Sequence, residues 1–346
     1  SGRMFRDGAP WRLIHRLIPK NILLAAYRNP MTLEELALEL GVAMPYMEEE
    51  VRLLAEGTLL REVAKGRYET DFIILDRETQ LAVNRRLERL GTAFTPLLIE
   101  WLDAAMEDVC RLIGRRFERG FLLWTLIPMA VDMFARETHR LHGVPDAYTS
   151  RPDGGEWDIV GYEKCDWPYD LGSMHNGIGD ESAGLFIYRF SIPGLWERAD
   201  APDEFEARVL IGAIRAGLTR DRLGRVEADT IRRLAERGWI ADDPKRIVPN
   251  FPVFRREDFE AEALRKYEAL PACRELVDMM GECYRELHGI IGKCCPARLA
   301  EQLKFVTGEQ LWSMRVICLR HALAEGHIAI PDDPERNRIG VYMKLA

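Results

Sequence analysis

The sequence predicts an α+β fold that is mainly helical, in which small helix-and-hairpin units are carried on a helical scaffold. Three observations predict it. Apolar residues recur at helical spacing over much of the chain, and short alternating runs flank glycine turns. One helix ending, Leu-Ala-Glu followed within two residues by Gly, occurs three times before a strand-like run. The length of 346 residues is enough for two or three domains.

The most specific pattern lies near the N-terminus and begins with three short helices. A first apolar helix is expected over residues 21–27. Thr32 and Glu35 form a capping box that begins a second helix, and Gly41 ends that helix. A third helix, with apolar residues again at helical spacing, precedes Gly57.

A two-stranded hairpin follows the third helix. Apolar and polar residues alternate from Leu59 to Ile74 across a turn at Gly66. Three helices followed by such a hairpin make a winged helix-turn-helix. We therefore expect this unit within residues 1–80.

The amino-acid sequence of this region also resembles those of known proteins. Leu36-Ala37-x-x-Leu40-Gly41-Val42-x-x-Pro45 resembles the winged helix-turn-helix superfamily. Three segments are similar to uncharacterised transcription regulators of Gram-positive bacteria, some of them joined to a sigma-70-like RNA polymerase sigma factor: PKNILLAAY (19–27), GVAMPYMEEEV (41–51) and RYETDFII (67–74). The resemblance implies a role in transcription regulation, with duplex DNA and RNA polymerase or a sigma factor as partners.

The third helix of this unit has the wrong charge for DNA. Its first turns end in three consecutive glutamates, 48 to 50, where DNA-reading helices carry Ser, Thr, Lys, Arg or Asn. A duplex with one negative charge per about 1.7 Å would repel them, and only Lys65 and Arg67 at the wing tip have the right sign. Two interpretations stay open. The unit either binds DNA or is a protein-interaction or dimerisation module, whose candidate contacts are Met44, Tyr46, Glu48 and Glu49.

The ending of the third helix recurs twice downstream. Leu54-Ala55-Glu56 recurs as Leu234-Ala235-Glu236 and as Leu323-Ala324-Glu325. Each of the last two copies is followed by an Asp-Asp-Pro sequence, at nearly the same distance along the chain from the copy. The matching Asp-Asp-Pro segments predict hairpin loops and two related winged units in tandem. Unrelated helix ends are the alternative, because Leu-Ala-Glu-x-Gly is a common way to end a helix.

These patterns divide the chain into five expected segments. A helical scaffold over 81–150 follows the first winged unit, and a Gly- and aromatic-rich segment with strands covers 151–200. A second winged-helix-like unit is expected over 201–256, and an acidic helix with a third such unit over 257–346.

Charge distinguishes the second unit from the rest. The whole chain carries a formal charge of -8 with a pI near 5.6, so any nucleic-acid binding must come from a local patch. Between Phe205 and Arg256 there are 12 basic residues against 7 acidic, and five guanidinium groups are expected near one helix start. They either bind DNA or pair with acidic residues of the segment from Glu257 to Glu286. The DNA-binding candidates are Lys65, Arg67, Arg220, Arg222, Arg225, Arg232 and Arg233.

The middle of the chain changes from helical to mixed. Helices are expected over Asn84–Ile113 and Phe117–His142, and strands over Trp157–Tyr162 and Leu185–Ile192. The aromatic, Gly-rich loop Cys165–Gly177 lies between the strands. It either lines a ligand pocket of a sensor or forms a hairpin packed on the helices.

The sequence does not favour an enzyme. It has no nucleophile elbow, phosphate loop or dinucleotide fingerprint, so no catalytic residue and no cofactor is expected. Glu137, His139 and His142 share one helix, but a metal site needs a further ligand, and His at a helix C-terminus also favours the dipole. The adjacent Cys294 and Cys295 are interpreted as a buried thiol pair. A small-molecule enzyme with a deep pocket near His175 is the third hypothesis.

The cysteines and the apolar runs bear on location. Seven cysteines without a Cys-x-x-Cys spacing fit reduced thiols in a cytoplasmic protein. The longest apolar run, residues 120–131, is shorter than the roughly 20 residues of a spanning helix, so no membrane partner is expected. Residues 1–4 carry no secretory signal and suggest a cut from a longer chain.

Overall fold

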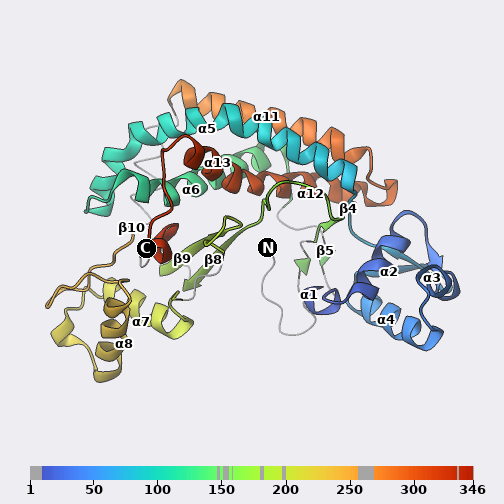
Figure 1. Ribbon diagram of the computed structural model, residues 1–346, viewed down its shortest axis with the longest axis horizontal. Coiled ribbons are helices and arrows are strands. Elements are labelled where there is room, and N and C mark those ends of the chain that lie inside the picture. Colours follow the sequence, from blue (N-terminus) through green and yellow to red (C-terminus); the bar gives the residue numbers. More distant parts are fainter. Residues whose placement is uncertain are drawn as a thin grey trace. The chain divides into compact units, whose positions relative to one another are not determined.

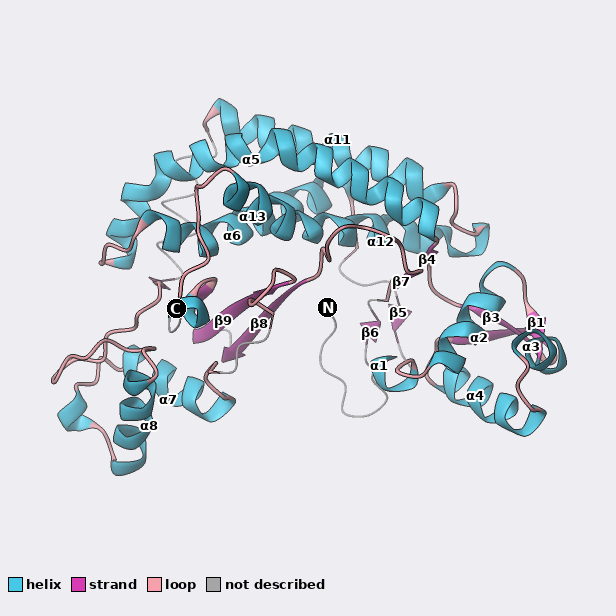
Figure 2. Cartoon of the chain, viewed as in Figure 1, coloured by secondary structure: helices cyan, strands magenta, loops and turns pink. Residues whose placement is uncertain are grey.

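The computed structural model describes residues 10–145, 149–150, 156–157, 159–179, 183–196, 200–255, 269–332 and 335–345. It confirms a mixed α+β fold that is mainly helical (Figures 1 and 2). Two compact units are formed from stretches that are distant in the sequence. Unit 1 contains Ser1–Arg85, His139–Asp166 and Tyr284–Gln310, and unit 2 contains Arg86–Thr138, Trp167–Cys283 and Leu311–Ala346. The five consecutive segments expected from the sequence stay a prediction.

Unit 1 begins with the elements that the N-terminal pattern predicts, after a short helix α1 (Pro10–Leu13). We use "N-terminal module" for residues 17–75. Its elements are α2 (Leu17–Arg28), β1 (Met31–Thr32), α3 (Leu33–Leu40), α4 (Met44–Glu56), β2 (Leu60–Ala64), β3 (Arg67–Thr70) and β4 (Ile74–Leu75). The first three strands form an antiparallel sheet in the order β1-β3-β2.

Local signals explain the boundaries of this module. The side chain of Thr32 accepts a hydrogen bond from the Glu35 amide at 3.2 Å, and the Glu35 carboxylate accepts one from the Thr32 amide at 2.8 Å. This capping box begins α3, as predicted. Gly41 ends α3 with φ 63°, a conformation that glycine adopts without steric cost. The hairpin turns at Gly66, also as predicted, but β3 ends at Thr70 and does not continue to Ile74.

The remainder of unit 1 contains the short strands β5 (Thr149–Ser150), β6 (Glu156–Trp157) and β7 (Gly161–Tyr162). β5 pairs with β6, whereas β7 pairs in parallel with β4. The single strand predicted over 157–162 is therefore wrong, because its two ends join different partners. Two further elements complete this unit: the 3-10 helix η3 (Ala297–Gln302) and α12 (Leu303–Gln310).

Three long helices contribute residues to both units: α5 (Arg77–Ile113), α6 (Arg119–His142) and α11 (Pro271–Gly292). The first two confirm the predicted scaffold helices, and α5 begins seven residues earlier than predicted. Each encloses one proline, Pro96 in α5 and Pro128 in α6.

Unit 2 is built around a four-stranded sheet in the order β10-β11-β9-β8. The strands are β8 (Ser173–Gly179), β9 (Ala183–Phe190), β10 (Val253–Arg255) and β11 (Val341–Leu345). β8 and β9 form an antiparallel hairpin, so residues 173–177 belong to a strand and the expected loop is shorter. Residues 173–177 thus belong to a hairpin, as one interpretation predicts, whereas residues 165–172 form no strand.

Helices on one side of this sheet form an apolar core with it. α7 (Glu204–Arg215) and α8 (Arg225–Glu236) are joined by the 3-10 helix η1 (Arg220–Arg222). Buried residues of both helices pack with Leu185 and Ile187 of β9 and with Val341 of β11. Unit 2 also contains η4 (Leu311–Ser313), α13 (Met314–Ala324) and η5 (Glu335–Arg338).

The segment from Asp203 to Phe251, here the "α7–α8 module", repeats the element order of the N-terminal module. An extended residue, Thr219, follows the first helix and forms an antiparallel bridge with Arg246. η1 and α8 come next, and the chain then folds back through an antiparallel bridge between Ile240 and Pro249. The predicted hairpin at the first Asp-Asp-Pro is thus present, and the Asp243 carboxylate caps its turn by accepting from the amides of Lys245 and Arg246 at 2.8 Å.

The third expected unit differs from this pattern. The predicted helix ending at Leu323–Glu325 is the end of α13, but residues 327–332 form no strand. β11 follows instead and pairs with β9 and β10 of the central sheet. The hairpin predicted there is wrong for these residues, since the strand finds its partners elsewhere in the chain. Asp333 and Pro334 of the second Asp-Asp-Pro lie outside the described residues.

Candidate nucleic-acid interface

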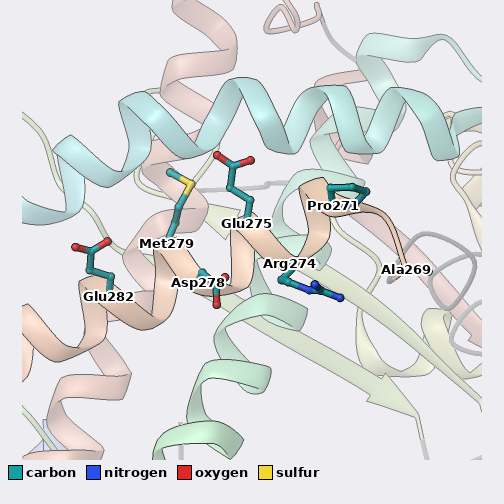
Figure 3. Close-up of a pocket in the computed structure, with 7 residues that line it drawn as sticks. All are labelled: Ala269, Pro271, Arg274, Glu275, Asp278, Met279 and Glu282. Atoms are coloured by element: carbon teal, nitrogen blue, oxygen red, sulfur yellow. The ribbon is translucent and has the colours of Figure 1, made fainter.

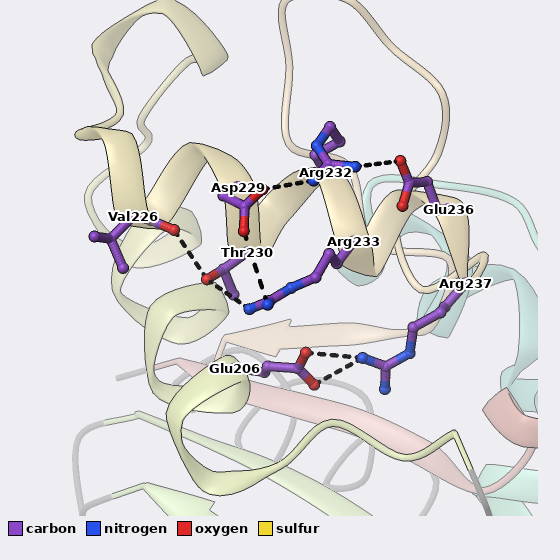
Figure 4. Close-up of polar contacts among 8 residues, drawn as sticks. All are labelled: Glu206, Val226, Asp229, Thr230, Arg232, Arg233, Glu236 and Arg237. Atoms are coloured by element: carbon purple, nitrogen blue, oxygen red, sulfur yellow. Dashed lines mark hydrogen bonds and ion pairs between the residues drawn. The ribbon is translucent and has the colours of Figure 1, made fainter.

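α8 carries three of the basic residues predicted for DNA, of which Figure 4 shows Arg232 and Arg233. Arg225 is the first residue of the helix, and Arg232 and Arg233 lie in its last two turns. Arg222 ends η1, just before α8 begins. All four side chains are exposed. The prediction of five guanidinium groups near one helix start is therefore wrong, because two of them are two turns further along the helix.

Carboxylates of the same helix neutralise two of these arginines. Arg232 donates to Asp229 at 2.5 Å and to Glu236 at 2.6 Å, and Arg233 lies 3.7 Å from Asp229 (Figure 4). The Arg232 guanidinium holds the pKa of Asp229 below its usual value. Intramolecular pairing was one of the two predicted outcomes, and it is confirmed for these two residues. The partners, however, are not those predicted in 257–286; of that segment, residues 257–268 lie outside the described residues.

A buried ion pair holds α8 against α7. Arg237 donates to both carboxylate oxygens of Glu206 at 2.8 Å (Figure 4). It also donates to the carbonyl of Asp200 at 2.6 Å. The indole of the buried Trp239 donates to the same carbonyl at 2.8 Å. These contacts fix the direction in which α8 presents its exposed arginines. Nη1 of Arg237 donates to both oxygens of Glu206 while Nη2 donates to the Asp200 carbonyl, so one guanidinium serves both acceptors.

Arg220, the remaining candidate of this module, has a structural role. Its guanidinium is half-buried and donates to the carbonyl of Ala241 at 3.2 Å, while its amide donates to the carbonyl of Lys245. It ties η1 to the hairpin that follows α8. Of the five arginines predicted here, Arg222 and Arg225 are the exposed ones that make no side-chain ion pair within 4.0 Å to another described residue.

The wing candidates of the N-terminal module also differ from each other. Lys65 is exposed at the hairpin tip. Arg67 donates to the carbonyl of Pro30 at 2.7 Å and to Glu35 at 2.9 Å, so it connects the wing to the start of α3. Lys65 can therefore reach a phosphate without breaking a contact, whereas Arg67 cannot.

The α4 surface of the N-terminal module is acidic, but less so than predicted. Tyr46, Glu48 and Glu49 are exposed, and Met44 is half-buried. Glu50 is only 7% exposed and accepts from Arg16 at 2.8 Å. The prediction that all three glutamates face outward is wrong for Glu50, because the helical period turns it toward the side of Met47 and Val51.

A buried polar cluster of unit 2 could not be found from the sequence. Asp132 on α6 pairs with Arg315 on α13 and accepts from the Tyr188 hydroxyl of β9 at 2.8 Å. His175 of β8 stacks on Tyr188 with ring centroids 4.2 Å apart, and burial lowers its pKa to about 3. These residues come from three separate regions of the chain, since β8 and β9 are consecutive, and no motif connects them. Asp132, Tyr188 and Arg315 are buried and bonded to one another, so they connect the sheet to the helices, whereas His175 is half-buried.

Other predicted chemistry finds little support in the geometry. A hollow of about 380 Å³ lies along α11, and three of the seven residues that line it are the carboxylates Glu275, Asp278 and Glu282 (Figure 3). Over the described ranges, no group of three or more His, Cys, Asp or Glu side chains is placed to hold a metal ion. Cys294 and Cys295 are half-buried free thiols, and burial raises the pKa of Cys295 to about 11. Such a thiol is a poor nucleophile.

Comparison of the chain with protein-family models, curated proteins and solved structures found no match. None of the helices in the described part of the chain has the length and apolar character needed to cross a membrane. The functional argument therefore depends on the residues and the geometry alone.

Proposed function

We propose that this chain is a non-enzymatic transcription regulator in which the N-terminal module and the α7–α8 module are winged helix-turn-helix units. In this proposal α8 of the second unit contacts duplex DNA, with Arg222 and Arg225 on phosphates. Lys65 at the tip of the first wing adds a further phosphate contact. The role in transcription regulation carries over the expectation for residues 19–74 and is part of the proposal, with RNA polymerase or a sigma factor as the proposed protein partner.

The observation that carries the proposal is the shared order of elements. In both modules a helix is followed by an extended residue, a second short helix, a third helix and an antiparallel pair. In both, the returning strand of that pair also bonds to the extended residue: β3 to β1 in the first, and Arg246 to Thr219 in the second. This shared order supports the proposal that both modules are winged units, in which α4 and α8 would have the position of the recognition helix.

The charges on α8 make it a better candidate for DNA contact than α4. Its ion pairs are solvent-exposed, and exposed pairs are weak because water and salt screen them. Phosphates of a duplex can replace Asp229 and Glu236 as partners of Arg232, since releasing condensed counterions from DNA is favourable. α4 offers Glu48 and Glu49 at the equivalent place, and these are repelled.

A titration of the full chain with labelled duplex DNA tests the proposal. We expect binding that weakens steeply with salt, with the slope of log K against log salt falling by about 0.9 for each phosphate contact removed. The variant R222A/R225A should bind about tenfold more weakly, and R232A/R233A should weaken binding less. The matched control is R85A/R89A, which removes the same charge from the exposed side of α5. Absence of binding at low salt, or an equal loss in the control, would overturn DNA contact by α8.

The second candidate is a protein-interaction module that does not bind DNA directly. The acidic exposed face of α4, with Tyr46 at its start, favours it. The same titration separates the two, because this candidate predicts no salt-dependent DNA binding by any variant.

A further inference from the structure

We propose that the exposed face of α3 and α4 docks a basic, amphipathic helical segment of a protein partner. We define this "α3–α4 face" by six residues: Glu34, Leu38, Glu39, Tyr46, Glu48 and Glu49. The inference rests on the proposed function only for the winged arrangement of the first module. It does not depend on DNA binding by α8, which lies in the other unit.

The first observation is a strong local excess of negative charge. Seven acidic residues and one basic residue, Arg52, lie between Leu33 and Glu56. Three of the seven have partners within the module or just before it: Glu35 with Arg67, Glu50 with Arg16 and Glu56 with Arg52. For the four remaining carboxylates, no cation of the described residues lies within 4.0 Å. Their charge is available to a partner.

The second observation is that the same two helices, α3 and α4, each expose one large apolar side chain. Leu38 is 87% exposed and Tyr46 is 68% exposed. They flank the turn of residues 41–43 between the two helices, while Leu36 and Met47 next to them are fully buried in the core. The core is thus complete without Leu38 and Tyr46. Aromatic and aliphatic anchors surrounded by charge are the usual composition of a protein-binding surface.

The sign of the charge identifies the kind of partner. A nucleic acid is excluded, because its phosphates would meet four unpaired carboxylates. A protein segment that carries Lys or Arg on one side and apolar residues at helical spacing on the other would satisfy both parts of the face. The carboxylates would speed and orient the encounter, and Leu38 and Tyr46 would supply most of the affinity.

Fluorescence anisotropy with three synthetic peptides tests this inference on the full chain. The probe is a labelled helical 18-residue peptide of Lys and Leu with an amphipathic pattern. A Lys/Ser peptide of equal charge and a Glu/Leu peptide of equal amphipathicity are the comparisons. We expect the Lys/Leu peptide to bind at least about tenfold more tightly than either, because only it matches both charge and apolar anchors.

Two double variants locate the binding site. E48Q/E49Q and L38S/Y46S should each weaken binding of the Lys/Leu peptide by about tenfold. The controls are E100Q/E107Q, which removes two exposed carboxylates from α5, and L141S, which removes an exposed leucine from α6. Both controls should change affinity by less than about twofold.

Three results would overturn the inference: no binding of the Lys/Leu peptide, equal binding of the Lys/Ser peptide, or equal losses in the control variants. The last two would indicate nonspecific attraction to an acidic protein. Thermal unfolding of each variant shows whether it folds. If L38S/Y46S does not fold, the single variant Y46S provides the test with less disturbance of the structure. DNA binding measured on E48Q/E49Q should stay unchanged, so this inference and the proposed function can fail separately.

Discussion

The N-terminal module and the α7–α8 module share an order of elements but neutralise their buried carboxylates in different ways. In the α7–α8 module, Glu206 of α7 pairs with Arg237, which directly follows α8. In the N-terminal module, Glu69 of β3 pairs with Arg61 of β2 and also with Arg298 of η3, which lies far along the chain. The first arrangement is complete within its module, and the second is not.

The difference indicates how the N-terminal module is held in unit 1. Arg298 lies with Nε 2.9 Å from Glu69, and it donates to the backbone carbonyls of Tyr27 at 2.5 Å and Thr70 at 3.0 Å. Gln302 adds a hydrogen bond to the carbonyl of Asp71 at 2.9 Å. Four acceptors at the edge of the module thus depend on two residues of η3. The α7–α8 module has its corresponding carboxylate satisfied by its own residues.

The largest effect is expected from R298A. The substitution leaves Glu69, which is almost fully buried, with only Arg61, and it leaves two backbone carbonyls without a donor. We expect a loss of about 4 kcal/mol in the free energy of unfolding, measured by urea denaturation. R285A, which removes an exposed arginine of unit 1, is the control and should change stability by less than about 0.5 kcal/mol.

A double variant identifies the cause of that loss. E69Q/R298A removes the buried charge together with its partner, so it should recover part of the stability that R298A loses. If the double variant is less stable than R298A, the buried charge is not the reason for the loss, and the backbone contacts of Arg298 carry it.

A smaller effect is expected from R237A in the α7–α8 module. Glu206 then stays buried with its role in the α7 capping box as the remaining contact, and Asp200 loses one of two donors. We expect a loss of about 3 kcal/mol by the same measurement, since the Arg237 side chain is partly exposed and water can replace some of its contacts. The control is R208A, whose exposed pair with Glu204 lies on the same module. Equal losses in R237A and R208A would contradict a buried clamp.

The contrast between the modules also shows which features local sequence can predict. Helix starts and turns depend on residues that are neighbours in the chain, and Thr32 with Glu35, Gly41 and Gly66 identified them correctly. The third helix was likewise identified from the spacing of its apolar residues. Each of these signals acts within a few residues, so the physics of the element is contained in the element.

Long-range pairing could not be predicted in this way. Nothing around Arg298 distinguishes it from the other arginines of the chain, yet it is the partner of Glu69. The sequence predicts a hairpin after Leu323–Glu325, and β11 instead joins a sheet with strands from elsewhere in the chain. The basic residues of α8 are evident from the sequence, but a charge count does not say that Arg232 is paired with Asp229 and Glu236.

The two capping boxes should behave alike, which makes them a test of the parts that the modules share. Thr32 caps α3 and Asp203 caps α7, each through its side chain and a glutamate three residues later. We expect T32A and D203A each to lose about 1 kcal/mol of unfolding free energy. T32S and D203N keep an oxygen acceptor and should lose less than half of that. If only one of the two alanine variants loses stability, the cap of the other module is not what begins its helix.

The smallest effects are expected from two aspartates that respond to pH with opposite signs. Burial raises the pKa of Asp71 in the N-terminal module, while hydrogen bonds from the Arg246 and Lys245 amides lower the pKa of the exposed Asp243 in the α7–α8 module. A raised pKa means that the folded state binds the proton more tightly than the unfolded state, so the ionised Asp71 reduces stability at neutral pH. D71N should therefore increase the free energy of unfolding at pH 7, and the gain should vanish as the pH falls below about 4, where Asp71 is protonated in both states.

D243N should decrease stability at pH 7, and its cost should also vanish at acid pH, because the stabilisation by a lowered pKa is lost as the pH falls through that pKa. Urea denaturation of both variants at several pH values checks the signs, and two shifts in the same direction would contradict the assignment of burial to Asp71 and of amide bonding to Asp243.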